Sequence, residues 1–123
     1  MRADQSGKTD IETIARVCHE AVRAYCEALG ETALPPWDEA EDWQVEATLA
    51  AVCFRVENPD ASPGDQHQQW MEEKRRSGWQ FGHTRNDHLR THPMMVPFEA
   101  LPATEKRKDL LFQRVVDALS GEI

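Results

Sequence analysis

The stretch HQQWMEEKRRSGWQFG, residues 67–82, decides how the second half of the chain folds. Its side chains at His67, Trp70 and Lys74 are spaced i, i+3 and i+7, which places them near one face of a helix. A glycine then ends the helical pattern and is followed by alternating aromatic residues. The stretch therefore predicts a helix over residues 66–77 that leads directly into a short extended segment.

Two short strands are expected after this helix. The first is the extended segment Trp79–Phe81, and the second is PMMVPF at residues 93–98. The polar residues between them favour a turn, so we expect the two strands to pair as a hairpin.

Three further helices are expected from hydrophobic periodicity and capping residues. The first follows Asp10 and ends at Gly30, the second covers residues 42–57, and the last begins after Pro102. Residues 1–9 are predicted to be a flexible leader, and residues 10–120 a single domain. The predicted fold is mainly α (α+β), a compact bundle of about four helices with a small β-hairpin.

The charge of the chain is −8 and is unevenly distributed. Residues 1–66 hold five Lys/Arg and fourteen Asp/Glu, a net −9, whereas residues 67–123 hold nine and eight, a net +1. The overall charge disfavours nucleic acid as a partner, so any anion-binding surface is expected in the second half. The polar N-terminus, the three cysteines without CxxC spacing and the lack of a long apolar run favour a cytoplasmic protein that does not enter the membrane.

Motifs for catalysis and metal binding are weak. The cysteines lie on or beside apolar helix stripes, which is typical of packing rather than of nucleophiles. His83, His88 and His92 are spaced for a polar turn and lack the cysteines that usually complete a zinc site. The sequence also contains no GxxxxGK or GxGxxG phosphate loop. We expect no enzyme, no metal and no cofactor.

The aromatic and basic residues of the opening stretch remain to be explained. Trp70 has polar neighbours, so its indole could stack on a heterocyclic base while Lys74 and Arg75 meet phosphate. The alternative is that Trp70 and Trp79 close a small core, and for Trp79, followed by Phe81 at strand spacing, this alternative is favoured. For Trp70 both interpretations stay open at this point.

The chain resembles the RyR domain, the repeated module of ryanodine receptor calcium channels that also occurs alone in small bacterial and phage proteins. The resemblance covers roughly residues 10–120. It rests on an H-x-x-W helix that ends in G-W-x-(Y/F)-G, on a following H-P-x-(L/M)-V-P-(Y/F) segment, and on a leucine-rich last helix. The matching stretches are IARVCHEAVRAYCEALG at 14–30, PPW at 35–37, HQQWMEEKRRSGWQFG at 67–82, THPMMVPFEALP at 91–102 and KDLLFQRVVDAL at 108–119.

The resemblance implies a ligand site, because paired channel modules can hold an adenine nucleotide in the cleft between two halves. It places Trp70 against the base, Lys74 at the phosphate or ribose, and His92 and Asp109 nearby. An acid at Asp109, where channel repeats often have asparagine, puts direct phosphate contact there in doubt, and Phe81 replaces a commoner tyrosine. The candidate ligand-binding residues are Trp70, Lys74, His67, Arg75, His92, Asp109, Trp79, Phe81 and Arg85.

The function expected from the resemblance is a non-enzymatic module that binds an adenine-containing nucleotide or a nucleotide-derived second messenger. It would act as a sensor or a sequestering sponge in a prokaryotic or phage conflict setting. A homodimer could recreate the tandem pair of the channels through an isologous interface. The alternative is a protein-interaction or scaffold module in which the same indoles anchor a partner.

Overall fold

The first helix, α1 (Ile11–Ala28), starts and ends where the sequence predicts. The carboxylate of Asp10 caps the start of the helix by accepting the Thr13 backbone N–H at 2.8 Å. Gly30, just beyond its end, has a positive φ of 77°. The computed structural model describes residues 10–32 and 34–121. The leader expected at residues 1–9 lies outside the described residues.

The second and third helices are joined by a loop rich in turn residues. Helix α2 (Asp42–Glu57) opens on a capping box between Glu41 and Gln44 and has the predicted bounds. Helix α3 (Pro63–Arg76) begins three residues before its predicted start. The reason is that Ser62 and Asp65 form a second capping box, which allows proline at the first helical position.

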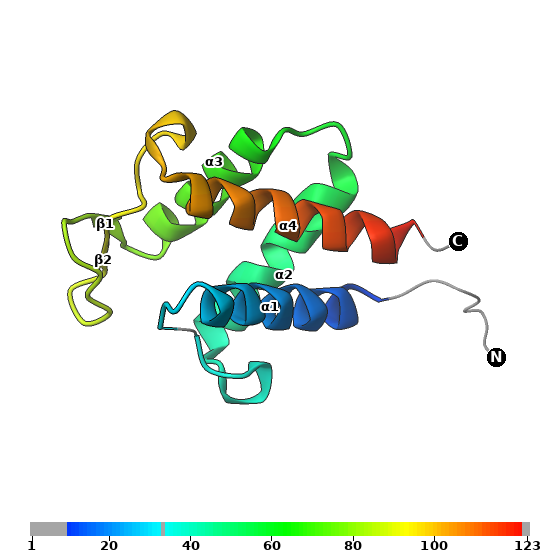
Figure 1. The fold of residues 1–123 in the computed structure, drawn as a ribbon, viewed down its shortest axis with the longest axis horizontal. Coiled ribbons are helices and arrows are strands. Elements are labelled where there is room, and N and C mark those ends of the chain that lie inside the picture. Colours follow the sequence, from blue (N-terminus) through cyan, green and yellow to red (C-terminus); the bar gives the residue numbers. More distant parts are fainter. Residues whose placement is uncertain (1–9, 33, 122–123) are drawn as a thin grey trace.

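The last helix, α4 (Ala103–Ser120), follows Pro102 as expected and packs along α1. Figure 1 shows α1 and α4 running lengthwise, with α2 crossing behind them and α3 beside α4. The buried core lies between α1, α2 and α4, and Val115 and Leu119 of α4 pack against it. Its fully or nearly buried members are Ile14, Ala15, Cys18, Trp37, Val52 and Val116.

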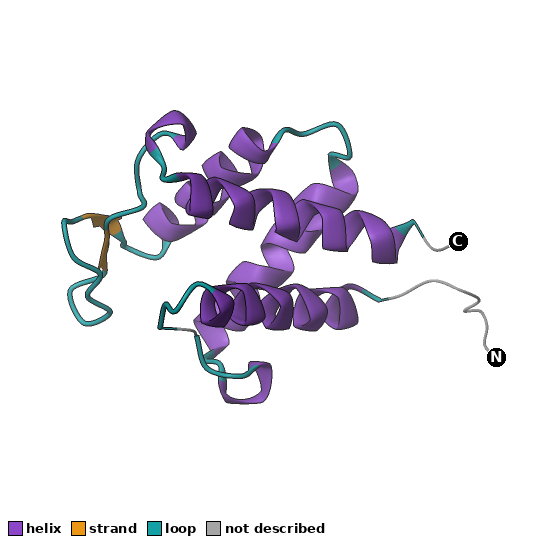
Figure 2. Cartoon of the chain, viewed as in Figure 1, coloured by secondary structure: helices purple, strands orange, loops and turns teal. Residues whose placement is uncertain are grey.

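The predicted hairpin is wrong in topology. Strands β1 (Gln80–Phe81) and β2 (Thr91–His92) pair in parallel, with Gln80 opposite Thr91 and Phe81 opposite His92. The loop between them makes its own antiparallel bridge from Asn86 to Thr91, and Arg90 takes a positive φ of 58°. The chain has therefore completed a full loop before Thr91, and β2 runs in the same direction as β1. Figure 2 shows the two short strands beside the loop that joins them.

The expected second strand at residues 93–98 is also not formed. Pro93 has no N–H to donate to a sheet, and the next N–H, of Met94, is bound by His92 Nδ1 at 3.1 Å. Pro97 then opens a short 3₁₀ helix, η2 (Phe98–Ala100). The prediction of a mainly α fold with four helices and a small β element is confirmed for the described residues.

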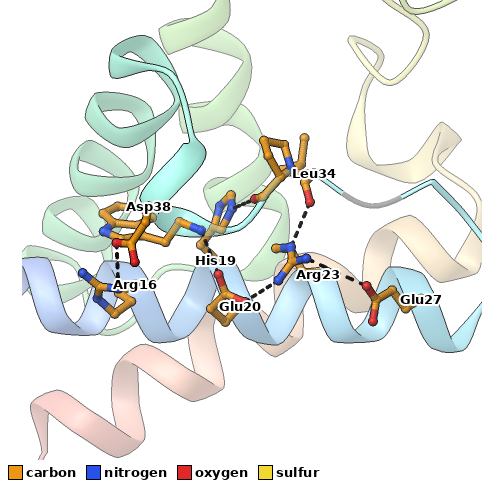
Figure 3. A network of polar contacts seen from close by, with 9 residues as sticks. Arg16, His19, Glu20, Arg23, Glu27, Leu34 and Asp38 are labelled. Carbon is orange, nitrogen blue, oxygen red and sulfur yellow. Dashed lines mark hydrogen bonds and ion pairs between the residues drawn. The ribbon is translucent and has the colours of Figure 1, made fainter.

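A polar network fastens the connector between α1 and α2 onto α1 (Figure 3). His19 Nε2 donates to the Pro35 carbonyl at 2.7 Å, and Arg23 Nε donates to the Leu34 carbonyl at 2.8 Å. The carboxylate of Glu20 accepts the Trp37 N–H, which starts the 3₁₀ helix η1 (Trp37–Glu39). These bonds hold the Trp37 indole in the core.

Among the residues described, no helix combines the length and the apolar character needed to cross a membrane.

Candidate functional site

A cavity of about 310 Å³ lies among the four helices and the segment that carries Arg85 and His92. Its walls are mostly apolar, with a few polar side chains, which is typical of small-molecule sites. Six of the nine residues predicted from the sequence line it: His67, Trp70, Lys74, Arg85, His92 and Asp109.

Helix α3 delivers three of these side chains from one face. His67 is buried, and its Nε2 donates to the Val96 carbonyl at 2.7 Å. The Trp70 ring stacks on the His67 ring at 5.4 Å with an interplanar angle of 21°. The i, i+3 spacing noted in the sequence therefore becomes a fixed pair, and His67 covers part of one face of the indole.

Lys74 is a buried cation surrounded by aromatic rings. Its side chain nitrogen lies 4.2 Å from the ring centre of Trp79, 4.4 Å from that of Trp43 and 5.7 Å from that of Trp70. In the described part of the chain it forms no ion pair. Burial, together with the nearby Arg85, lowers the pKa of Lys74 to about 8. Lys74 thus remains mainly charged at neutral pH while its positive charge is uncompensated.

His92 lies against the edge of this aromatic group. Its ring is 5.1 Å from that of Trp70 in an edge-on arrangement, and its Nδ1 accepts the Met94 N–H. Burial, with the positive charges of Arg85 and Lys74, lowers the pKa of His92 to about 4. His92 is therefore neutral at neutral pH, with its proton on Nε2.

Asp109 of α4 lies opposite, on the His67 side of the cavity. Its Oδ2 is 3.7 Å from His67 Nδ1. Burial raises the pKa of Asp109 to about 7, and the negative charge of Glu105 one turn earlier adds to this effect. Burial also lowers the pKa of His67. The two groups are therefore both driven towards their neutral forms.

A second cation in the cavity wall, Lys108, is fully paired. Its ammonium donates to Glu105 at 2.8 Å and to Glu31 at 3.0 Å, so it ties α4 to the end of α1. Burial acts against its charge, but the hydrogen bonds with Glu105 and Glu31 outweigh burial and raise the pKa of Lys108. Lys108 is a structural cation, in contrast to Lys74.

The other predicted site residues lie outside the cavity wall or at its margin. Arg85 lines the cavity but is exposed and pairs with Asp87 at 2.9 Å. Arg75 points to solvent, and Trp79 is buried beneath the Lys74 ammonium. Phe81 is 48% exposed and touches only the edge of His83 among aromatic rings of the described chain. The structure thus brings six of the nine together and leaves Arg75, Trp79 and Phe81 out.

The sequence did not single out Trp43, Glu105 and Lys108, which all line the cavity. Trp43 of α2 donates its Nε1–H to Glu41 at 2.7 Å, and its ring faces Lys74. No local spacing could have indicated this, because Trp43 and Lys74 meet only when α2 and α3 pack together.

The groups that could support covalent chemistry or metal binding are constrained. Cys18 lines the cavity, but burial raises the pKa of its thiol to about 12, and its Sγ–H points to the Phe112 carbonyl at 3.9 Å. Within residues 10–32 and 34–121, no three histidine, cysteine, aspartate or glutamate side chains gather in a metal-binding group.

A wider hollow of about 550 Å³ lies between the end of α2 and the outer side of α3. It contains none of the predicted residues, and acidic and amide side chains dominate its wall. Unlike this hollow, the 310 Å³ cavity around Trp70 and Lys74 combines aromatic, apolar and cationic groups.

Comparison with known families points to the segment that carries the predicted site residues. Residues 60–119 match the family model of the RyR domain. This segment contains α3, both strands and α4, and therefore all nine predicted site residues, while α1 and α2 supply the remaining wall of the cavity. The match confirms the resemblance to the RyR domain family for residues 60–119.

Proposed function

We propose that this protein is a non-enzymatic module that binds an adenine-containing nucleotide, or a signalling molecule derived from one, in the cavity between α3 and α4. The single observation that carries the proposal is that one cavity joins an indole, Trp70, to a buried ammonium, Lys74, that has no acidic partner in the described chain. A planar base and an anionic group are the two chemical features that such a pair complements.

The size and polarity of the cavity favour a small ligand. About 310 Å³ lies at the lower end of the roughly 300–1,000 Å³ of small-molecule sites. The apolar walls suit a base, while Lys74 and Arg85 provide positive charge at the side that the β1–β2 loop covers. A mononucleotide fits this description better than a dinucleotide does.

The proposal favours binding over nucleophilic or histidine-based catalysis because two reactive side chains of the cavity wall, Cys18 and His92, are held in inactive states. The Cys18 thiol has a pKa far above neutral, and His92 has its Nδ1 lone pair occupied by a backbone N–H. Neither is prepared to transfer a proton or attack a ligand at neutral pH.

The biological setting and the assembly state follow from the family resemblance. A sensor or a sequestering sponge in a prokaryotic or phage conflict is the proposed role, in the cytoplasm. A homodimer, with its ligand cleft completed by a second module, is the proposed assembly. The walls of the present cavity all come from one chain, so ligand binding and dimerisation can be tested separately.

The proposal is tested by thermal denaturation with a panel of adenine mononucleotides, cyclic nucleotides and ADP-ribose derivatives. A ligand at about 100 times its Kd should stabilise the protein by about 2.7 kcal/mol. Trp70→Ala should abolish this gain, whereas Arg75→Ala, on the solvent side of the same helix, should retain it. Mass spectrometry of small molecules released from the native protein, with a molecular-mass measurement in solution, would identify the ligand and the assembly.

A panel without any stabilising ligand would contradict the proposal, as would the same gain in Trp70→Ala and in the unmodified protein.

A protein-interaction module is the second candidate, and one observation favours it. Phe81, at the end of strand β1, and Leu89, in the β1–β2 loop, are 48% and 65% exposed. Large apolar side chains that are exposed in this way can anchor a protein partner. This candidate predicts that Leu89→Asp abolishes co-purification with a specific partner without changing nucleotide-dependent stabilisation.

A further inference from the structure

Asp109 has polar atoms that face the cavity and are not bonded to protein groups in the described chain. Its side chain is 20% exposed, and the nearest basic atom is His67 Nδ1 at 3.7 Å. A separation of 3.7 Å is too long for a hydrogen bond. The carboxyl group of Asp109 therefore lines the cavity and is available to form hydrogen bonds with a ligand.

The tautomer of His67 restricts the protonation state of Asp109. A carbonyl oxygen only accepts, so the contact with Val96 requires the proton of His67 on Nε2. In a neutral ring Nδ1 then carries a lone pair, which faces the Asp109 oxygen. Two acceptors facing each other in a buried site repel, unless a proton lies on one of them.

The charges around Asp109 favour placing that proton on its carboxyl group. From α4 itself, Glu105 is one turn away and repels a carboxylate; the ammonium of Lys108 attracts one, but it is bound by Glu105 and Glu31, and burial with Glu105 outweighs it. From α3, His67 is buried and its pKa is lowered. Other charged or titratable groups that face the cavity lie on α1, on α3 and on the β1–β2 side: Cys18, His19, Cys26, Lys74, Arg85 and His92. His19 is bonded to the Pro35 carbonyl.

We infer that Asp109 recognises the base of the ligand as a neutral carboxylic acid, with its O–H donating to a ring nitrogen and its C=O accepting from the adjacent amino group. This inference rests on the proposed function. Adenine presents this pair of groups side by side, an acceptor nitrogen next to an exocyclic amine. A carboxylic acid matches the pair in the way an asparagine amide does, whereas a carboxylate can satisfy only the amine.

Two consequences follow for specificity and regulation. Asp109 selects for the amino group of the base, and it avoids the phosphate, which Lys74 and Arg85 attract instead. Binding of the base also becomes dependent on pH, because the O–H that donates to the ring nitrogen is lost when Asp109 ionises. The raised pKa of Asp109, about 7, places this change near neutrality.

The experiment uses adenosine, which lacks the phosphate and so removes both the ionisation of that group and its attraction to Lys74. The affinity of the unmodified protein should fall above pH about 7, approaching tenfold per pH unit. Asp109→Asn keeps a donor and an acceptor but does not ionise, so its affinity should stay constant over the same range. Purine riboside, which lacks the amino group, should bind about tenfold more weakly to both proteins at acidic pH.

Glu105→Gln provides a second variant that leaves Asp109 in place. It removes the negative neighbour while keeping an oxygen for Lys108, so the midpoint of the affinity loss should move to lower pH.

The outcomes separate this inference from the proposed function. Adenosine binding that is independent of pH in the unmodified protein overturns the inference alone, and so does the same pH dependence in Asp109→Asn. Absence of binding by adenosine and by AMP at every pH overturns the proposed function, and the inference with it.

Discussion

The two ends of the bundle differ in whether a buried cation has an acidic partner. At one end Arg55 of α2 is 9% exposed and binds Asp117 of α4 with two hydrogen bonds of 2.7 and 2.8 Å. At the other end Lys74 is 8% exposed and faces three indoles, while Asp109 lies across the cavity from it. Both cations are buried to the same degree, so burial alone does not distinguish their roles.

The pKa directions show what the difference means. The Arg55 guanidinium lowers the pKa of Asp117, whereas burial raises the pKa of Asp109 to about 7. Asp109 and Asp117 are on the same helix, eight residues apart, and differ in whether a cation meets them. The Arg55 end uses its charges to join α2 to α4. The Lys74 end leaves the Lys74 ammonium and the Asp109 carboxyl group without an oppositely charged partner in the described chain, which costs stability and leaves both groups available to a ligand.

The largest expected effect is at the paired end. Arg55→Ala should lower the free energy of unfolding by about 3 kcal/mol, because it removes a bidentate ion pair and a hydrogen bond to the Ala61 carbonyl. Chemical denaturation measures this. The control is Arg76→Ala, whose pair with Glu73 is exposed and should contribute less than about 1 kcal/mol. Equal losses in the two variants would remove the distinction between a structural pair and a surface pair.

A smaller effect of opposite sign is expected from Asp109→Asn. The pKa of Asp109 is higher in the folded state, about 7 against 3.8, so between these values the folded protein holds more protons and loses stability as pH rises. Asp109→Asn avoids this loss and should be more stable than the unmodified protein above pH 7 by about 2 kcal/mol, roughly half of the ~4 kcal/mol that the full shift corresponds to, because the Asp109 side chain stays 20% exposed to solvent.

This difference should close as the pH approaches 3.8. Asp87→Asn, at an exposed position, serves as the control and should show no such dependence. A stability gap for Asp109→Asn that is the same at all pH values would mean that the carboxylate is not destabilised in the folded protein.

Lys74 should also make the free energy of unfolding depend on pH, in this case at alkaline pH. Its pKa is about 8 in the folded protein against 10.5 for an ordinary lysine, so between these values the unfolded chain holds more protons and stability rises with pH. We expect a rise of about 1.5 kcal/mol between pH 8 and about pH 9.5 that is absent in Lys74→Met. Arg75→Met, on the exposed side of the same helix, should retain the rise. A rise that persists in Lys74→Met would assign it to another group.

The smallest effect tests the aromatic surroundings of Lys74. Trp43→Phe replaces an indole by a ring that attracts cations less, so it should weaken the contact by about 0.5 kcal/mol. A double-mutant cycle with Lys74→Met isolates this coupling from the packing change at Trp43. A coupling energy of zero would mean that Trp43 fills space without holding the ammonium.

Much of the helical fold could be predicted because its signals are local. Asp10, the Asn-Pro pair after α2 and Pro102 mark helix ends through their own backbone chemistry, and each acts where the sequence predicts. The early start of α3 at Pro63 was also available, since Ser62 and Asp65 form a capping box. The prediction of a hairpin was wrong because the direction in which the chain enters β2 at Thr91 depends on the Asn86 bridge and on the backbone conformation of Arg90. No neighbouring residue in the sequence dictates either feature.

The candidate site likewise has one part that the sequence predicts and another that it does not. The spacing of His67, Trp70 and Lys74 placed them on one face, because a helix fixes the relative positions of residues three and four apart. The roles of Trp79 and Phe81 could not be separated by strand alternation. One is buried under Lys74 and the other is exposed, because only two residues of this segment enter the sheet.

The sequence by itself determined the four helices, their caps and the face of α3 that carries Trp70 and Lys74, since these follow from periodicity and backbone hydrogen bonding over a few residues. Only the tertiary structure decided that Trp43 from α2 and Asp109 from α4 meet that face across one cavity. It also decided that Lys74 is left without an acid in the described chain while Arg55 obtains one. The physical reason is that burial and charge pairing depend on which helices pack together, and that packing joins residues too far apart in sequence for local patterns to record.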